Sequence, residues 1–199
     1  MKTVKEQILD IARKQSVFRA GDIPNVEKPR TELCRMVAQG ELVRVGRGLY
    51  SLPDAEIGEN HSLAEAVKQY HGGVVCLISA LYFHRIGTQL PYETWLMRQD
   101  RNVAPVKGFP VRFFYCTGNA FSFGIEKHTI EGTKVSIYTP AKTVADCFKY
   151  RNKIGLDVAI EALREGWKAK LFTMDELWVA VKVCRVQKII QPYVEMLVQ

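Results

Sequence analysis

Near the N-terminus, apolar positions follow helical spacing twice and then alternate with polar ones. A helix is expected over residues 3–15, where a Thr-x-x-Glu capping box precedes apolar residues on one face. One helical turn fits residues 19–23. A second full helix fits residues 29–39, which begin with proline and are followed by glycine. Residues 41–52 alternate around two glycines, which is typical of a β-hairpin.

The order helix, short helix, helix and hairpin is that of a winged helix-turn-helix. In that arrangement the last helix enters the major groove of DNA, and the hairpin, or wing, contacts the flanking backbone. A polar stretch with proline and glycine at residues 52–60 separates this segment from the rest of the chain. We therefore predict a winged helix-turn-helix DNA-binding domain over residues 1–53.

The remaining pattern indicates helices, then strands, then helices. A capping box at Ser62 opens one helix, and strand-like runs follow between residues 93 and 138. Helices are expected again beyond them, with a capping box at Thr173 and a kink or break at Pro192. This order predicts an α+β protein rather than a doubly wound parallel sheet, with a larger mixed α+β domain over residues 60–199.

Basic residues are concentrated in the predicted N-terminal domain. The chain carries 28 Lys and Arg against 21 Asp and Glu, a formal net charge of +7, which favours a polyanionic partner. Ten of the basic and six of the acidic residues lie within residues 1–53, about a quarter of the chain. Arginine and lysine bind phosphates, and arginine also forms bidentate contacts with guanine. The predicted DNA contacts on the second helix, at its entrance and on the wing are Lys28, Arg30, Thr31, Arg35, Arg44 and Arg47.

Composition favours a globular protein, with 47% hydrophobic and 25% charged residues. The amphipathic N-terminus lacks the apolar core of a signal peptide, and nowhere do about 18 apolar residues run together. We therefore expect a cytoplasmic protein without a membrane partner. Five cysteines lie far apart with no CxxC pair, so reduced thiols are expected rather than a disulfide framework or a zinc site.

Enzyme signatures are scarce. The sequence has no GxSxG elbow, no phosphate loop of the Walker type, no HExxH and no complete dinucleotide fingerprint, and its four histidines lack ligand spacing. We expect a protein that is not an enzyme, with no catalytic residues, cofactor or metal. Two alternatives stay open. One is a winged-helix docking module that does not bind DNA. The other is a divalent-metal nuclease, whose C-terminal domain would use Glu126, Glu131 and Asp146 with Lys127, Lys134 and Lys149.

Three segments carry a resemblance to a known family. Residues 40–53, GELVRVGRGLYSLP, are similar to the wing pattern G-x-L-x-R-x-G-R-G-x-Y of the AbiEi antitoxins. Residues 79–87 resemble that family's Ala-Leu, His-Gly-Leu helix, and residues 139–146 resemble its P-x-R-T-x-x-D helix start. Two departures stand out, since Arg85 separates the histidine from the glycine segment and Lys142 replaces the arginine.

The resemblance implies a fold and a function. Members of the AbiEi family are the antitoxins of type IV toxin–antitoxin, or abortive-infection, systems. The resemblance implies an N-terminal winged helix that binds inverted repeats in the protein's own promoter and represses the operon. It further implies a C-terminal domain that opposes a nucleotidyltransferase toxin without forming a stable complex with it. The wing match falls on Arg44, Gly46, Arg47 and Gly48.

Overall fold

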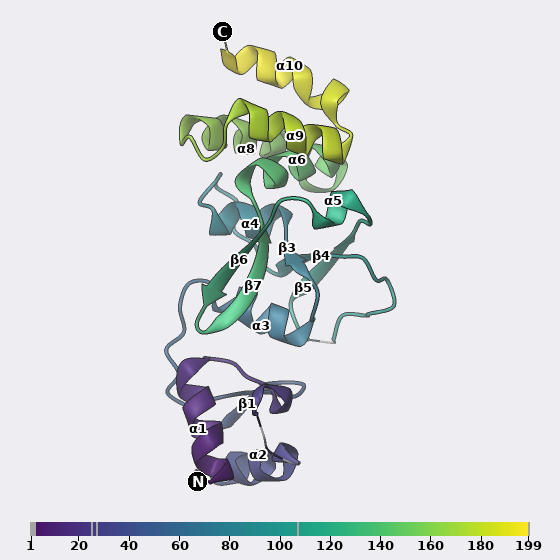
Figure 1. Ribbon diagram of the computed structural model, residues 1–199. Coiled ribbons are helices and arrows are strands. Elements are labelled where there is room, and N and C mark those ends of the chain that lie inside the picture. The colour runs from purple at the N-terminus through teal and green to yellow at the C-terminus, as the bar shows by residue number, and fades with distance from the viewer. Residues whose placement is uncertain (1–2, 25, 27, 107, 199) are drawn as a thin grey trace. The chain divides into compact units, whose positions relative to one another are not determined.

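The structure is a computed structural model that describes residues 3–24, 26, 28–106 and 108–198 (Figure 1). Contacts divide the chain into two compact units. Unit 1 comprises Met1–Gly72 and His128–Val135, and unit 2 comprises Gly73–Lys127 and Ser136–Gln199. The mixture of N-terminal helices, a central sheet and C-terminal helices confirms the α+β class that the sequence predicts. No helix among the described residues is long and apolar enough to cross a membrane.

Unit 1 begins with the predicted order of helices and hairpin. Helix α1 (Val4–Lys14) starts at the predicted capping box, in which Thr3 and Glu6 exchange hydrogen bonds. A 3-10 turn η1 (Ala20–Asp22) and helix α2 (Pro29–Ala38) follow. The apolar faces of these elements meet in a core of buried side chains, because each helix alone exposes one apolar stripe. The core comprises Ile8, Ala12, Phe18, Ile23, Leu33, Met36, Leu42 and Tyr50.

The predicted hairpin closes this core. Strands β1 (Val43–Gly46) and β2 (Leu49–Ser51) pair antiparallel, with an irregularity in register between Arg44 and Gly46. Gly48 lies in the turn with φ of +71°, a conformation that glycine adopts without strain. Tyr50 also pairs with Phe18 through two backbone hydrogen bonds of 2.9 and 3.0 Å, which fastens the hairpin to the segment after α1. We refer to residues 43–51 as the wing hairpin.

Helix α3 (His61–Gln69) belongs to unit 1, whereas the sequence placed its residues in the second domain. The helix packs against β2. The buried Lys68 ammonium donates to Asp22 Oδ2 at 2.6 Å and to Gln15 Oε1 at 2.8 Å. These contacts join α3 to residues that precede the polar stretch at residues 52–60. The border of the compact unit therefore lies after α3 and not at the break in composition. The helix begins at His61, one residue before the predicted Ser62 start, and has no side-chain cap.

Unit 1 also takes in the tip of a later hairpin, formed by strands β6 (Ile125–Ile130) and β7 (Thr133–Tyr138). Glu131 occupies that tip and accepts hydrogen bonds from the Ser16 hydroxyl and from the Gly58 N–H at 2.7 Å. Its carboxylate also lies 2.7 Å from His61 Nδ1. One carboxylate thus joins the end of α1, the 52–60 stretch and the start of α3.

Glu131 is expected to make unit 1 sensitive to acid. Burial raises the pKa of Glu131, but hydrogen bonds from Ser16, His61 and Gly58 outweigh it and leave the pKa below its ordinary value. A lowered pKa in the folded state gives stability that is present above the unfolded pKa of about 4.3 and is lost as the pH falls through the folded pKa. Glu131→Gln should therefore destabilise unit 1 at pH 7. It should also reduce the further loss of stability that the wild type shows when the pH falls. Thermal unfolding at pH 7 and at about pH 3.5 measures both effects, and Glu56→Gln, at an exposed site, is the control. Equal acid sensitivity of wild type and Glu131→Gln would contradict the assignment.

Gly132 is expected to be intolerant of substitution. Its φ is +74°, and a Cβ placed there would lie 1.9 Å from the Lys14 carbonyl oxygen. Gly72 in the same unit has a similar φ of +77° but nothing within 4 Å of such a Cβ. A left-handed alanine costs about 1–2 kcal/mol. Gly72→Ala should cost only this amount, and Gly132→Ala should cost clearly more, as measured by urea unfolding followed by circular dichroism. Equal losses in the two variants would show that the tip does not pack against α1.

A five-stranded mixed sheet runs through unit 2, in the order β5-β4-β3-β7-β6. Strand β3 (Val74–Val75) pairs antiparallel with β4 (Thr94–Arg98) and parallel with β7. Strand β4 pairs in parallel with β5 (Val111–Tyr115), which forms one edge. The far ends of β6 and β7 are the residues that belong to unit 1.

Helices pack around a central helix of unit 2, α6 (Pro140–Lys149), which is buried over most of its length. Thr139 caps it through its hydroxyl, as the Thr-Pro pair predicts. Helix α6 packs against α4 (Leu77–Phe83), α8 (Leu156–Lys168) and α9 (Met174–Cys184), visible as stacked ribbons in Figure 1. The short helices α5 (Asn119–Ser122) and α7 (Arg151–Ile154) complete this part.

The last helical stretch breaks at a different residue from the predicted one. The Thr173–Glu176 capping box opens α9 as predicted. The chain then breaks at Arg185, which takes a left-handed φ of +59°, and α10 (Gln187–Val198) continues through Pro192. Pro192 is in the second turn of α10, where it lacks the N–H that would donate to the Lys188 carbonyl, yet the helix continues past it. The expectation of a division at Pro192 is therefore wrong.

Candidate DNA-binding surface

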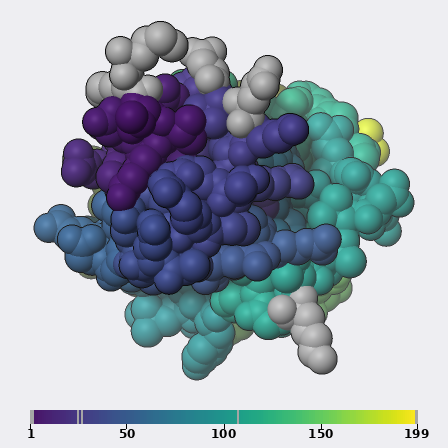
Figure 2. Space-filling view, turned by 90° about the horizontal axis from the view of Figure 1, so that it is seen from below, coloured from purple at the N-terminus to yellow at the C-terminus, as the bar shows by residue number. Residues whose placement is uncertain are grey.

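All six predicted DNA contacts are exposed in unit 1. Figure 2 shows this part of the chain, purple to blue, as a continuous surface. Lys28 is the N-cap of α2 and has a left-handed φ of +58°. Arg30, Thr31 and Arg35 lie on α2, Arg44 lies on β1, and Arg47 lies in the turn of the wing hairpin. Their exposure follows from the core, which takes Leu33 and Met36 to the opposite face of α2.

Two of the six residues line one hollow. Arg30 from the first turn of α2 and Arg47 from the wing hairpin both border a depression of about 600 Å³. The residues around it come from η1, the wing hairpin and the end of α3. Sequence reasoning did not single out Arg19 and His71, which also line the hollow. Neither carries a local signal, because they reach this place only through the packing of η1 and α3.

The hollow has a positively charged rim with one neutralised carboxylate. Asp22 accepts from the Arg19 backbone N–H at 2.8 Å and from Lys68 Nζ at 2.6 Å, so its negative charge is matched within the unit. Arg19 Nη2 donates to the Gln69 carbonyl at 3.3 Å. Arg19 Nε is buried and has no hydrogen-bond partner among the described residues. The hollow therefore carries two exposed guanidinium groups, those of Arg30 and Arg47.

Arg35 and Arg44 make contacts within the surface. Arg35 pairs with Glu32 at 2.5 Å, and the hydrogen bond and charge of Glu32 raise the pKa of Arg35. Arg44 Nε donates to the Gly46 carbonyl at 3.2 Å, which holds its side chain along the wing hairpin. Glu32 thus offsets the charge of Arg35 on this surface.

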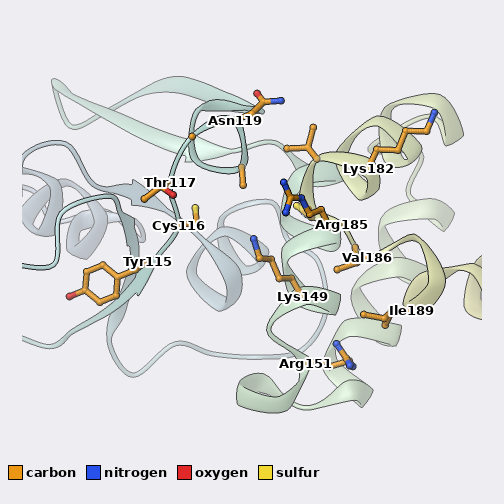
Figure 3. A pocket seen from close by; sticks show the side chains of 14 residues that line it. Tyr115, Cys116, Thr117, Asn119, Lys149, Arg151, Lys182, Arg185, Val186 and Ile189 are labelled. Atoms are coloured by element: carbon orange, nitrogen blue, oxygen red, sulfur yellow. The ribbon is translucent and has the colours of Figure 1, made fainter.

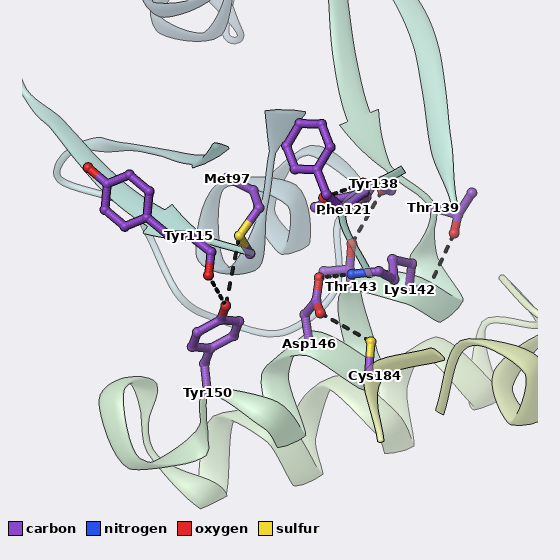
Figure 4. Close-up of polar contacts among 10 residues, drawn as sticks. All are labelled: Met97, Tyr115, Phe121, Tyr138, Thr139, Lys142, Thr143, Asp146, Tyr150 and Cys184. Carbon is purple, nitrogen blue, oxygen red and sulfur yellow. Dashed lines mark hydrogen bonds and ion pairs between the residues drawn. The ribbon is translucent and has the colours of Figure 1, made fainter. Parts of the chain in front are cut away.

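Residues 139–146, which resemble the family's helix start, contribute to a buried polar cluster in unit 2 (Figure 4). Lys142 Nζ donates to Asp146 Oδ2 at 2.5 Å and lies 4.1 Å from the centre of the Tyr138 ring. Cys184 Sγ donates to Asp146 Oδ1 at 3.2 Å, and Thr143 Oγ1 donates to the Tyr138 carbonyl at 3.3 Å. Both charged side chains are almost wholly buried, at 0% and 2% exposed. The cluster connects α6, β7 and α9 inside the unit, with its two charged groups buried.

The Asp146 carboxylate shifts the pKa values of the two side chains that bind to it, Lys142 and Cys184. Burial lowers the pKa of Lys142, but the carboxylate of Asp146 outweighs burial and leaves the pKa above its ordinary value. Lys142 therefore remains an ammonium. Burial, followed by the charge of Asp146, raises the pKa of the Cys184 thiol to about 12. A protonated thiol is a weak nucleophile, so this cysteine is suited to packing rather than catalysis.

The acids of the nuclease alternative are not gathered in one place. Asp146 is paired inside unit 2, Glu131 is held by Ser16, Gly58 and His61 in unit 1, and Glu126 is exposed on β6. The described residues contain no group of three His, Cys, Asp or Glu side chains placed to hold a metal ion. Each of the five cysteines is a free thiol.

Comparison with known proteins assigns the N-terminal segment to a family. Residues 6–53 match the family described as "Transcriptional regulator, AbiEi antitoxin". Over these residues, about a quarter of the chain, the sequence is similar to the AbiEi family. The AbiEi match runs from α1 to the end of the wing hairpin and so contains all six predicted contacts.

One solved structure supports the fold of the chain beyond the AbiEi match. The crystal structure of the RV2827C protein from Mycobacterium tuberculosis is similar, with a TM-score of 0.59 and 13% sequence identity. The similarity covers 92% of this chain and 72% of that chain. At this identity the likeness concerns the fold alone. Among curated proteins, none matches the chain.

Proposed function

We propose that this protein is the antitoxin of a type IV toxin–antitoxin system and the repressor of its own operon. It binds inverted repeats in double-stranded promoter DNA through α2 and the wing hairpin. The observation that carries the proposal is the hollow in unit 1 that is lined by both Arg30 of α2 and Arg47 of the wing hairpin, two residues of the AbiEi match. A helix and a wing that present arginines side by side suit a major groove and its flanking phosphates.

Phosphate contacts and base contacts have different roles in DNA binding. Arg47 on the wing hairpin is suited to the sugar–phosphate backbone, which positions the protein without reading sequence. Arg30, in the first turn of α2, is suited to a base edge, because recognition helices contact bases through their N-terminal residues. An inverted repeat calls for two copies of the chain, since two-fold DNA mirrors a two-fold arrangement of protein.

The antitoxin half of the proposal assigns no catalysis to this chain. The protein opposes a nucleotidyltransferase toxin in the cytoplasm without holding it in a stable complex. This assignment rests on the AbiEi match together with the resemblance of residues 79–87 and 139–146 to the family pattern. In support, Lys142 and Asp146 are used within the core of unit 2, which leaves them no part in chemistry at the surface.

A gel-shift titration tests the repressor half. The purified protein is titrated onto the DNA just upstream of its own coding sequence, with scrambled competitor at near-physiological salt. Specific binding is expected, and Arg47→Glu should abolish it. Arg13→Glu is the matched control, because Arg13 is exposed on α1 and does not line the hollow. Binding without preference over the competitor would reject the repressor function.

Co-expression tests the antitoxin half. A nucleotidyltransferase toxin of a type IV system is induced with and without this protein, and growth is followed. Rescue of growth is expected in wild type. Failure of rescue with a folded protein would reject the antitoxin function. A plasmid-nicking assay in Mg²⁺ with Glu126→Gln as its variant addresses the nuclease alternative, and no nicking is expected.

A further inference from the structure

A second positively charged cleft lies in unit 2, away from the residues of the AbiEi match (Figure 3). Its volume is about 870 Å³. Three segments line it: the loop after β5, the junction of α6 and α7, and the corner between α9 and α10. Its charged lining residues are all basic, and no Asp or Glu is among them: Lys149, Arg151, Lys182 and Arg185.

The four basic side chains are spread along the cleft. Figure 3 shows Lys149 and Arg185 near its middle, with Lys182 and Arg151 toward different ends. Lys182 and Arg185 have no ion-pair partner in the described part of the chain. Cations that converge on one point suit a single phosphate, whereas cations in a row suit successive phosphates of a strand.

Strand β5 brings aromatic rings to the edge of the cleft. Tyr115, which ends β5, lines the cleft, and its ring centre lies 6.4 Å from that of Phe113 on the same face of the strand. The Arg101 guanidinium lies 5.1 Å from the Tyr115 ring centre, and the Arg98 guanidinium lies 5.6 Å from the Phe113 ring centre. Tyr115, Phe113 and the two guanidinium groups thus form a row along β5, in which the planes of the two rings meet at 61°.

We propose that this cleft and the adjoining face of β5 bind a single-stranded nucleic acid. The phosphates lie along Lys149, Arg185 and their basic neighbours, and the bases stack at the accessible end of the row, on Tyr115 and Arg101. Unpaired bases stack on aromatic rings and on guanidinium planes. A duplex keeps its bases internal and gains nothing from such a row. An acidic peptide would pair with the basic side chains of the cleft, but it has no bases to stack on the aromatic rings.

This site is independent of the proposed promoter binding, because it uses unit 2 and a different form of nucleic acid. The test uses the full chain and fluorescence anisotropy with a labelled oligouridine of roughly twelve nucleotides, which is within the length that one such groove covers. The matching oligothymidine and a duplex of the same length are titrated in parallel. Preference for either single strand over the duplex supports the proposal. The ratio of oligouridine to oligothymidine affinity tells which sugar the site accepts.

The decisive variant is Lys149→Gln/Arg185→Gln. Lys149 lies in the last turn of α6, and Arg185 is the left-handed residue that ends α9. The matched control is Lys168→Gln/Lys170→Gln, because Lys168 lies in the last turn of α8 and Lys170 is left-handed with φ of +55°. Both variants lose two positive charges at equivalent helix ends. The cleft variant should bind oligouridine at least about tenfold more weakly than the control. With fewer phosphate contacts, binding releases fewer counterions from the oligonucleotide and is therefore weaker.

Two further variants test the stacking row and the independence of the site. Tyr115→Ala should weaken binding roughly tenfold, and Tyr115→Phe, which keeps the ring, should retain it. Arg47→Gln should leave binding of the single strand unchanged. Three results would overturn the proposal: no binding of either single strand, equal loss in the cleft and control variants, or abolition of binding by Arg47→Gln.

Discussion

Arg30→Ala is expected to weaken binding to the upstream DNA by roughly five- to 150-fold, and Arg47→Ala is expected to weaken it through the loss of a phosphate contact. A base-reading arginine contributes about 1–3 kcal/mol, and about 1.4 kcal/mol corresponds to a factor of ten. Both side chains line one hollow, so the double variant need not lose the sum of the single effects. Gel-shift titration of the two single variants and the double variant measures the losses.

The salt dependence separates the two roles. Removal of a phosphate contact lowers the slope of log affinity against log salt by about one, whereas removal of a base contact relaxes specificity at one position. We expect the slope change for Arg47→Ala and the relaxed specificity for Arg30→Ala. Arg35→Ala should have a smaller effect, because Glu32 pairs with Arg35 at 2.5 Å. Unchanged binding in all three variants would reject the assigned surface.

Lys142→Met is expected to destabilise unit 2 by about 3–5 kcal/mol. The substitution leaves the Asp146 carboxylate buried without its ammonium partner, and breaking a buried ion pair in this way costs far more than breaking an exposed one. Urea unfolding followed by tryptophan fluorescence measures the loss. All three tryptophans lie in unit 2, so the signal reports on that unit.

Removing both charges of the pair is the informative comparison. Lys142→Met/Asp146→Leu leaves no unpaired charge in the core, and apolar replacement of both partners is often neutral or stabilising. The double variant should therefore recover most of the stability that Lys142→Met loses. Lys168→Met, at an exposed position of α8, is the control and should change stability little. A double variant as unstable as Lys142→Met would mean that the site needs the pair for more than charge balance.

Short-range features of the molecule were predictable from sequence. The Thr3–Glu6 and Thr173–Glu176 capping boxes form as predicted, because a cap involves residues three apart. The wing hairpin forms around Gly48, whose positive φ is a local demand of the turn. The α+β class followed from the order of these elements. The exposed positions of the basic residues on α2 followed from its helical period.

The partners of residues far apart in sequence were not predictable in this way. The sequence placed α3 and the tip of the β6–β7 hairpin in the second domain, yet Lys68 and Glu131 tie them to unit 1 through residues 15–22 and 58–61. The break near the C-terminus lies at Arg185 rather than Pro192. Neither result has a local signature, because each depends on which surfaces meet after the helices have formed.

The candidate site divides along the same line. By itself the sequence determined that a hairpin follows α2, that both elements are basic, and that the hairpin carries the family pattern. These features depend on composition and on the geometry of neighbouring residues. Only the tertiary structure decided that Arg30 and Arg47 share a hollow with Arg19 and His71. It likewise decided that Lys142 and Asp146 pair in the core and that four cations of unit 2 line one cleft. The reason is that packing of apolar faces brings together side chains whose spacing along the chain carries no sign of their meeting.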